Sequence, residues 1–126
     1  MGLQILAPIS MGELIDKITI LELKCELITD AEKLENVHRE LDALELIAVS
    51  LPVSQEVLIL KEELLKVNGL LWHIENYKRA CEVSGDFDAK FIEAARNVYL
   101  NNDLRAKIKH KINVLTGSTI VEEKSY

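Results

Sequence analysis

The sequence has little proline, glycine, cysteine or aromatic content, with 2 Pro, 5 Gly, 2 Cys and 5% aromatic residues in 126 positions. No GxSxG, HExxH or CxxC motif and no Gly-rich phosphate loop occurs in it. There is also no low-complexity tract and no linker long enough to separate domains. The sequence therefore leaves enzymatic activity, and any catalytic residues, undetermined.

An excess of basic residues is also missing. The 15 Lys and Arg residues stand against 21 Asp and Glu residues, a formal net charge of −6. We therefore expect neither nucleic acid nor an anionic membrane as a partner. The charge is uneven, because residues 1–63 have a net charge of −8 and residues 64–126 have a net charge of +2. Halves of opposite sign favour self-association or pairing within the chain.

The sequence lacks long hydrophobic runs. No segment approaches the ~20 apolar residues of a membrane span, and residues 1–10 do not have the basic and apolar regions of a signal peptide. Cys25 and Cys81 lie in apolar helical patterns, which predicts two buried free thiols and a reducing compartment. We therefore expect a cytoplasmic protein without a disulfide.

Aliphatic residues are plentiful, with 20 Leu and 13 Ile, enough for one globular domain over residues 1–126. Their spacing is helical throughout. Ser10 and Glu13 are spaced as a capping box, in which each side chain accepts a hydrogen bond from the other residue's amide. Breaks and caps of this kind predict five helices, at about residues 11–28, 30–51, 55–83, 88–102 and 103–117.

Apolar residues recur at alternating steps of 3 and 4 over residues 34–51 and 60–74. This heptad spacing is typical of packed helix pairs. We predict an all-α fold with a long antiparallel helical hairpin of residues 30–51 and 55–83, with Leu44 in its interior and shorter helices packed beside it. The flanking segments, residues 3–9 and 118–121, are candidates for a minor two-stranded ribbon.

Asp16 shares a helical stripe with the apolar residues Ile20, Leu23 and Leu27. A carboxylate placed among them loses water and needs a cation or hydrogen-bond donors. We expect a cationic partner for Asp16, and the candidates are Lys17, Arg79, Arg96 and Arg105.

Asn68, Trp72 and Glu75 form a second strip, at steps of 4 and 3 on one predicted helix. Trp72 is either a core anchor or part of the wall of a pocket. The basic run at residues 105–111 is either a solvated helix face or a contact for phosphate, and it has no interleaved aromatics for reading nucleic acid. Glu35 and His38 have a metal-ligand spacing but lack the further Glu and His residues of a di-metal bundle.

Together these residues form one candidate ligand or partner site. It consists of Glu13, Asp16, Lys17, Lys24, Asn68, Trp72, Glu75 and Arg105. We expect no metal ion and no cofactor there.

Residues 8–24 read PISMGELIDKITILELK, which contains the pattern PxSxGELIDKITILExK, and the chain ends in EEKSY at residues 122–126. With LWHIE at residues 71–75 and ARNVY at residues 95–99, these segments resemble a family of small bacterial and phage proteins of unknown function. The resemblance covers nearly the whole chain. It implies a bacterial or phage origin and no particular reaction.

Two functions fit these features. The first is a non-catalytic helical interaction or assembly module, a homodimer or a binder of another protein, since its apolar stripes exceed what one small domain can cover. The alternative is a small enzyme or binding protein for an anionic metabolite, phosphorylated or sugar-linked, held at the candidate site.

Overall fold

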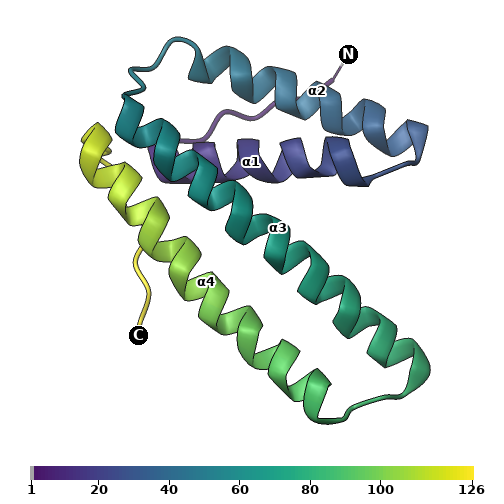
Figure 1. Ribbon diagram of the computed structural model, residues 1–126. Helices are drawn as coiled ribbons and strands as arrows, with labels where there is room; N and C mark the ends of the chain where they lie inside the picture. Colours follow the sequence, from purple (N-terminus) through teal and green to yellow (C-terminus); the bar gives the residue numbers. More distant parts are fainter. Residues whose placement is uncertain (1) are drawn as a thin grey trace.

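A computed structural model describes residues 2–126, and it is all-α (Figure 1). Its helices are α1 (Met11–Leu27), α2 (Ala31–Ala48), α3 (Gln55–Ser84) and α4 (Ala89–Thr116). About 74% of the chain is helical. None of these helices is long and apolar enough to cross a membrane.

Most of the helix ends follow from short sequence signals. Ser54 and Asp88 cap α3 and α4 by accepting hydrogen bonds from amides of the first turn. Gly85 and Gly117 end the same helices with φ of 76° and 65°, a left-handed conformation that only glycine adopts without strain. Helix α2 begins after Asp30, whose side chain accepts from the amide of Glu32.

The predicted division of residues 88–117 into two helices is wrong, because α4 is continuous from Ala89 to Thr116. The predicted break lies at Asn101 and Asn102. Asparagine costs a helix only a few tenths of a kcal/mol, and neither Gly nor Pro occurs between the two ends of α4. Asn101 also donates to the carbonyl of Asn97 inside the helix, over 2.8 Å.

The structure contains a long antiparallel hairpin, but its two arms are α3 and α4 (Figure 1). The predicted pairing of α2 with α3 is wrong, since these helices do not pack against each other. Heptad spacing shows that α2 and α3 each have an apolar stripe, which we call a seam. It does not indicate which helix packs on that seam. The seam of α2 faces α1 instead, and Leu44 is only half-buried.

Helix α1 is the central element, and it contacts all three other helices. This agrees with its apolar residues lying on two sides. Helices α1 and α2 lie across the end of the hairpin that contains the start of α3 and the end of α4 (Figure 1). At 1.5 Å per residue the 30 residues of α3 span ~45 Å and the 17 of α1 only ~25 Å, so the hairpin extends past α1.

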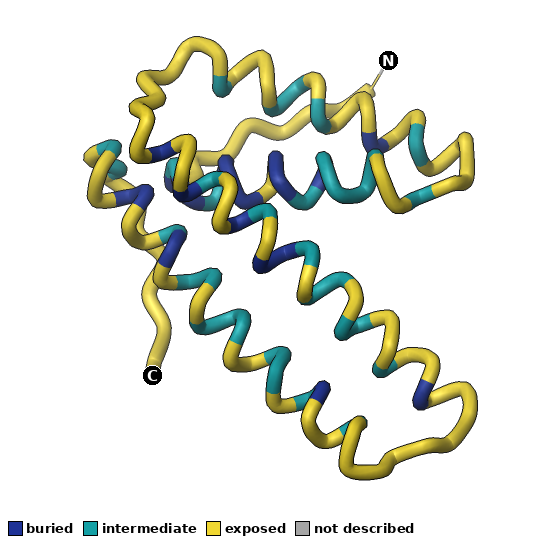
Figure 2. The backbone as a smooth tube through the Cα atoms, in the orientation of Figure 1, coloured by how far each residue is buried: buried dark blue, intermediate teal, exposed yellow. Residues whose placement is uncertain are grey.

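Buried residues gather where α1 crosses the hairpin (Figure 2). The core there consists of seven buried aliphatic residues: Ile15, Val57, Leu60, Leu64, Val67, Ile108 and Ile112. Leu64 and Ile112 are completely enclosed. Helix α2 adds one buried residue, Val37. The α1–α3–α4 junction therefore provides most of the hydrophobic stabilisation.

No strand occurs in residues 2–126, so the predicted terminal ribbon is absent. Residues 4–7 and Ile9 instead line a groove with α2 and with the turn that follows α4. The two cysteines are free, but only Cys81 is buried as predicted. Cys25 is half-buried, and its Sγ lies 3.6 Å from Nδ1 of His38.

Candidate functional site

The start of α1 docks side-on against the end of α4. Ser10, which is buried, accepts a hydrogen bond from the amide of Glu13 over 3.1 Å, as its capping-box position predicts. The amide of Gly12 donates to Oδ1 of Asn113 on α4 over 2.7 Å, and the amide of Met11 donates to Oγ of Ser118. The first turn of α1 is thus satisfied by side chains from the other end of the chain.

Gly12 allows this close approach. A Cβ at this position would lie 2.5 Å from the carbonyl oxygen of Lys109 and 2.9 Å from Oδ1 of Asn113. The first of these atoms belongs to the backbone of α4 and cannot turn away. The glycine of the PxSxGELIDK segment is therefore a packing requirement.

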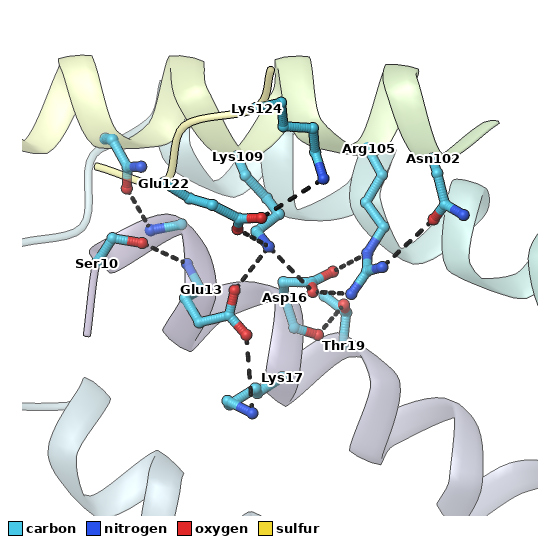
Figure 3. Close-up of polar contacts among 12 residues, drawn as sticks. Ser10, Glu13, Asp16, Lys17, Thr19, Asn102, Arg105, Lys109, Glu122 and Lys124 are labelled. Atoms are coloured by element: carbon cyan, nitrogen blue, oxygen red, sulfur yellow. Dashed lines mark hydrogen bonds and ion pairs between the residues drawn. The ribbon is translucent and has the colours of Figure 1, made fainter. Parts of the chain in front are cut away.

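Three contacts in register connect α1 to α4, and we name them the α1–α4 ladder: Gly12 with Asn113, Glu13 with Lys109, and Asp16 with Arg105. Figure 3 shows the second and third of these contacts. The partners on α4 are spaced by four residues, so they share one helix face. Residue numbers rise along α1 as they fall along α4, because the two helices run in opposite directions.

Asp16 lies at one end of the ladder and is fully buried. Its Oδ1 accepts from Nε of Arg105 over 3.0 Å, and its Oδ2 accepts from Nη2 of the same guanidinium. Nζ of Lys109 lies 3.8 Å from Oδ2. This confirms the expected cationic partner, and Arg105 was among the four candidates. A bidentate pair of this geometry offsets much of the cost of burying the carboxylate.

Asn68 connects the ladder to α3. Its Nδ2 donates to Oδ1 of Asp16 over 2.9 Å and to Oγ1 of Thr19 over 3.0 Å. Thr19 in turn donates to the backbone carbonyl of Asp16 over 2.7 Å. Both N–H groups of the amide are therefore used, which fixes its orientation.

Lys109, which makes the middle contact of the ladder, joins three carboxylates. Its Nζ lies 2.6 Å from Glu13 and 3.2 Å from Glu122, in addition to the contact with Asp16. Glu13 does not return to the amide of Ser10 as a complete capping box would require. Its carboxylate binds Lys109 and Lys17 instead (Figure 3).

These contacts keep the two cations of the ladder charged. The hydrogen bonds to Asp16 raise the pKa of Arg105, although burial acts in the opposite direction. Burial lowers the pKa of Lys109, but the hydrogen bond to Glu13 and the charges of Asp16 and Glu13 outweigh it and raise the pKa overall. The hydrogen bond from Lys109 and its positive charge lower the pKa of Glu122.

The Glu122→Gln substitution tests how the C-terminal segment is held. At about pH 7 it is expected to lower the free energy of unfolding by less than about 1 kcal/mol, because the carboxylate is half exposed. A pKa below its ordinary 4.5 means that ionised Glu122 stabilises the fold above that pH and stops doing so as the pH falls through the folded-state pKa. Urea unfolding should show a difference from the wild type that shrinks as the pH falls below 4.5. A difference that grows on acidification would contradict this role.

A cleft opens beside the ladder. Its volume is about 420 Å³, and residues of α1, α3 and α4 line it. Asn68, Trp72, Glu75 and Arg105, four of the eight predicted site residues, are among them. Trp72 is half-buried, so its ring forms part of a wall and is not enclosed in the core.

The other four predicted residues do not line this cleft. Glu13 and Asp16 belong to the ladder, and Lys17 forms a 3.7 Å ion pair with Glu13. Lys24 lies in the last turn of α1 and forms no ion pair in the described part of the chain. Apart from Lys24, the predicted residues therefore belong to two adjoining features, a buried ionic ladder with its flanking ion pair and an open cleft, and Arg105 is part of both.

Three members of the cluster, Lys109, Asn113 and Glu122, are not among the site residues predicted from the sequence. A usable signal was present, because Arg105, Lys109 and Asn113 recur every four residues opposite the Glu13–Asp16 pair. Among residues 2–126 no group of three or more His, Cys, Asp and Glu side chains is arranged to hold a metal. Glu35 binds Arg39 of its own helix, and His38 contacts Cys25.

The fold and the site define a small all-α protein, in which a buried ionic ladder connects α1 to the α3–α4 hairpin. The chain belongs to the Family of unknown function (DUF6165), which matches it over residues 5–126. No curated protein and no solved structure matches the chain.

Proposed function

We propose that this protein is a helical interaction module that assembles as a homodimer through its α3–α4 hairpin. The observation that carries the proposal is an apolar face on that hairpin. Ile59, Leu70 and Tyr77 lie on one stripe of α3, because positions 11 and 7 residues apart return to the same side of a helix. Their exposed fractions are 53%, 50% and 40%.

Helix α4 has a matching stripe of Leu100, Leu104 and Leu115, each about half exposed. A groove of about 460 Å³ runs between the two helices and is lined by Ile59 and Leu115, among others. No residue of α1 lines it. The apolar face therefore lies away from the helices that complete the core, and an exposed patch of this kind is typical of a protein interface.

A second copy of the chain is the occupant that fits this face. Two helical hairpins packed about a two-fold axis form a four-helix bundle, with α3 of one copy against α4 of the other. Glu56 borders the α3 side of the groove and Lys111 borders the α4 side, and neither forms an ion pair within residues 2–126. In such a dimer the acidic border faces the basic border of the partner.

The Leu70→Glu substitution tests this interface. A carboxylate placed in the centre of an apolar contact should weaken self-association at least about 30-fold, measured as the dimer dissociation constant by sedimentation equilibrium. The matched control is Leu46→Glu on α2, a helix that does not contact the hairpin arms, where the side chain is 75% exposed. This control should leave the dissociation constant unchanged.

The reverse result would contradict the proposal. If Leu46→Glu dissociates the protein and Leu70→Glu does not, the interface is on α2. Circular dichroism of both variants establishes that the helices are intact, so that a loss of association is not mistaken for unfolding.

A cytoplasmic location belongs to the same proposal. Cys25 and Cys81 are both free. Free thiols are usual where glutathione and thioredoxin keep cysteines reduced, which supports the cytoplasm as the compartment.

A further inference from the structure

The cleft beside the ladder has an apolar wall on which one face of a ligand's ring, such as a sugar ring, can pack. Ile20, Leu23, Leu71 and Trp72 provide this wall. The indole N–H of Trp72 forms no hydrogen bond within residues 2–126, and one face of a sugar ring presents C–H groups that pack well on an indole. A volume of about 420 Å³ lies in the range of small-ligand pockets.

Asn68 presents an acceptor that the fold does not use. Its two N–H groups are fixed on Asp16 and Thr19, so the orientation of its Oδ1 is fixed as well. No described residue donates to this oxygen, and it is not one of the fully buried atoms, all of which have partners. Asn68 itself is only 6% exposed and lines the cleft. Asn68 therefore adds a fixed hydrogen-bond acceptor to the residues that line the cleft.

Asn102 presents the complementary donor. Its Oδ1 accepts from Nη1 of Arg105 over 3.5 Å, which leaves Nδ2 without a partner in residues 2–126. Glu75 adds a carboxylate to the lining. A hydroxyl group both donates and accepts, so neighbouring donors and acceptors of this kind match a polyhydroxylated ligand.

The charges of the cleft favour one anionic group. Arg105 is neutralised by Asp16, and Glu75 pairs with Lys78 over 3.6 Å. Arg79 lines the cleft and forms no ion pair in the described chain. One guanidinium is therefore available for a phosphate or a carboxylate, its preferred partners.

We propose that this cleft binds a sugar that carries one phosphate or carboxylate group. The ring packs on Trp72, the hydroxyl groups bond to Asn68 and Asn102, and the anionic group binds Arg79. The cleft shares no residue with the groove of the proposed dimer. If the protein does not bind such a sugar, the homodimer proposal is therefore unaffected. If it does not dimerise, the sugar-binding proposal is unaffected.

Trp72 is the only tryptophan of the chain, so intrinsic fluorescence reports directly on the cleft. The wild-type protein is titrated with glucose 6-phosphate, glucuronate, glucose and inorganic phosphate. At least one of the two anionic sugars should change the emission of Trp72 in a saturable manner, and the one that does identifies phosphate or carboxylate as the anion. Glucose and inorganic phosphate should each bind at least about tenfold more weakly, because each lacks one half of the recognised chemistry.

Two matched variants distinguish binding of the anionic group by Arg79 from a general effect of the protein's positive charge. Arg79→Ala removes an exposed side chain of the cleft and should weaken binding of the anionic sugar at least about tenfold. Arg96→Ala removes another exposed arginine, which lies on α4 and does not line the cleft, and binding should be unchanged. The proposal is overturned if neither anionic sugar alters the emission at about 10 mM, if glucose binds as well as they do, or if the two arginine variants behave alike.

Discussion

Replacing Arg105 by methionine is expected to lower the free energy of unfolding by about 3 kcal/mol. The substitution leaves the carboxylate of Asp16 buried, with Asn68 and the more distant Lys109 as its remaining partners. Removing one member of a buried ion pair costs more than the pair contributes, because the remaining charge keeps its desolvation cost. Urea unfolding monitored by circular dichroism measures the difference.

Two controls make this result specific. Lys17→Met removes a different cation, on α1, which is 46% exposed and paired with Glu13. It should lower the free energy of unfolding by less than about 1 kcal/mol. The double variant Asp16→Asn, Arg105→Met should be more stable than Arg105→Met alone, because no buried charge remains without a partner. If the two substitutions are simply additive, the charge of Asp16 is not the source of the effect.

The Leu64→Ala substitution is expected to cost about 2–5 kcal/mol, which makes it the second large effect. Leu64 is 0% exposed and lies in the core formed by α1, α3 and α4. Truncation removes the transfer energy of its side chain and leaves a cavity among helices that cannot move together easily. Thermal or urea unfolding is again the measurement.

Leu44→Ala is the matched comparison for this core position. The heptad pattern placed Leu44 in the interior of a hairpin, whereas the structure places it half-buried on α2. Its truncation should therefore cost less than half as much as that of Leu64, since part of the side chain is already in water. Equal losses at the two positions would contradict the packing of α2 on α1 alone.

The sequence predicted helix ends better than helix partners, and the reason is physical. A helix cap depends only on local residues, such as Ser54 or Gly85, and on the neighbouring amides. The helix that packs on a given apolar stripe depends on residues far along the chain. The stripe of α2 is equally suited to α1 and to α3. The break predicted at Asn102 failed for a related reason, because tertiary packing easily outweighs the weak preference of asparagine.

The same limit applies to the site. Asp16 could be recognised as a buried carboxylate, because it interrupts an apolar stripe. Its partner could not be chosen from the sequence, since Arg105 is 89 residues away and three other cations were equally eligible. Glu122 could not be found at all, because residues 118–126 have no helical spacing that predicts where they lie. Trp72 had two possible roles, and only the structure shows that it lines a cleft.

The mass of the wild-type protein in solution tests the central claim most directly. Light scattering behind size exclusion at tens of micromolar should give twice the chain mass of 14.3 kDa, because in the proposed dimer a second copy covers the apolar face of α3 and α4. The mass should fall towards that of one chain on dilution. A constant mass of 14.3 kDa at every concentration would contradict the homodimer and leave that face without the partner proposed for it.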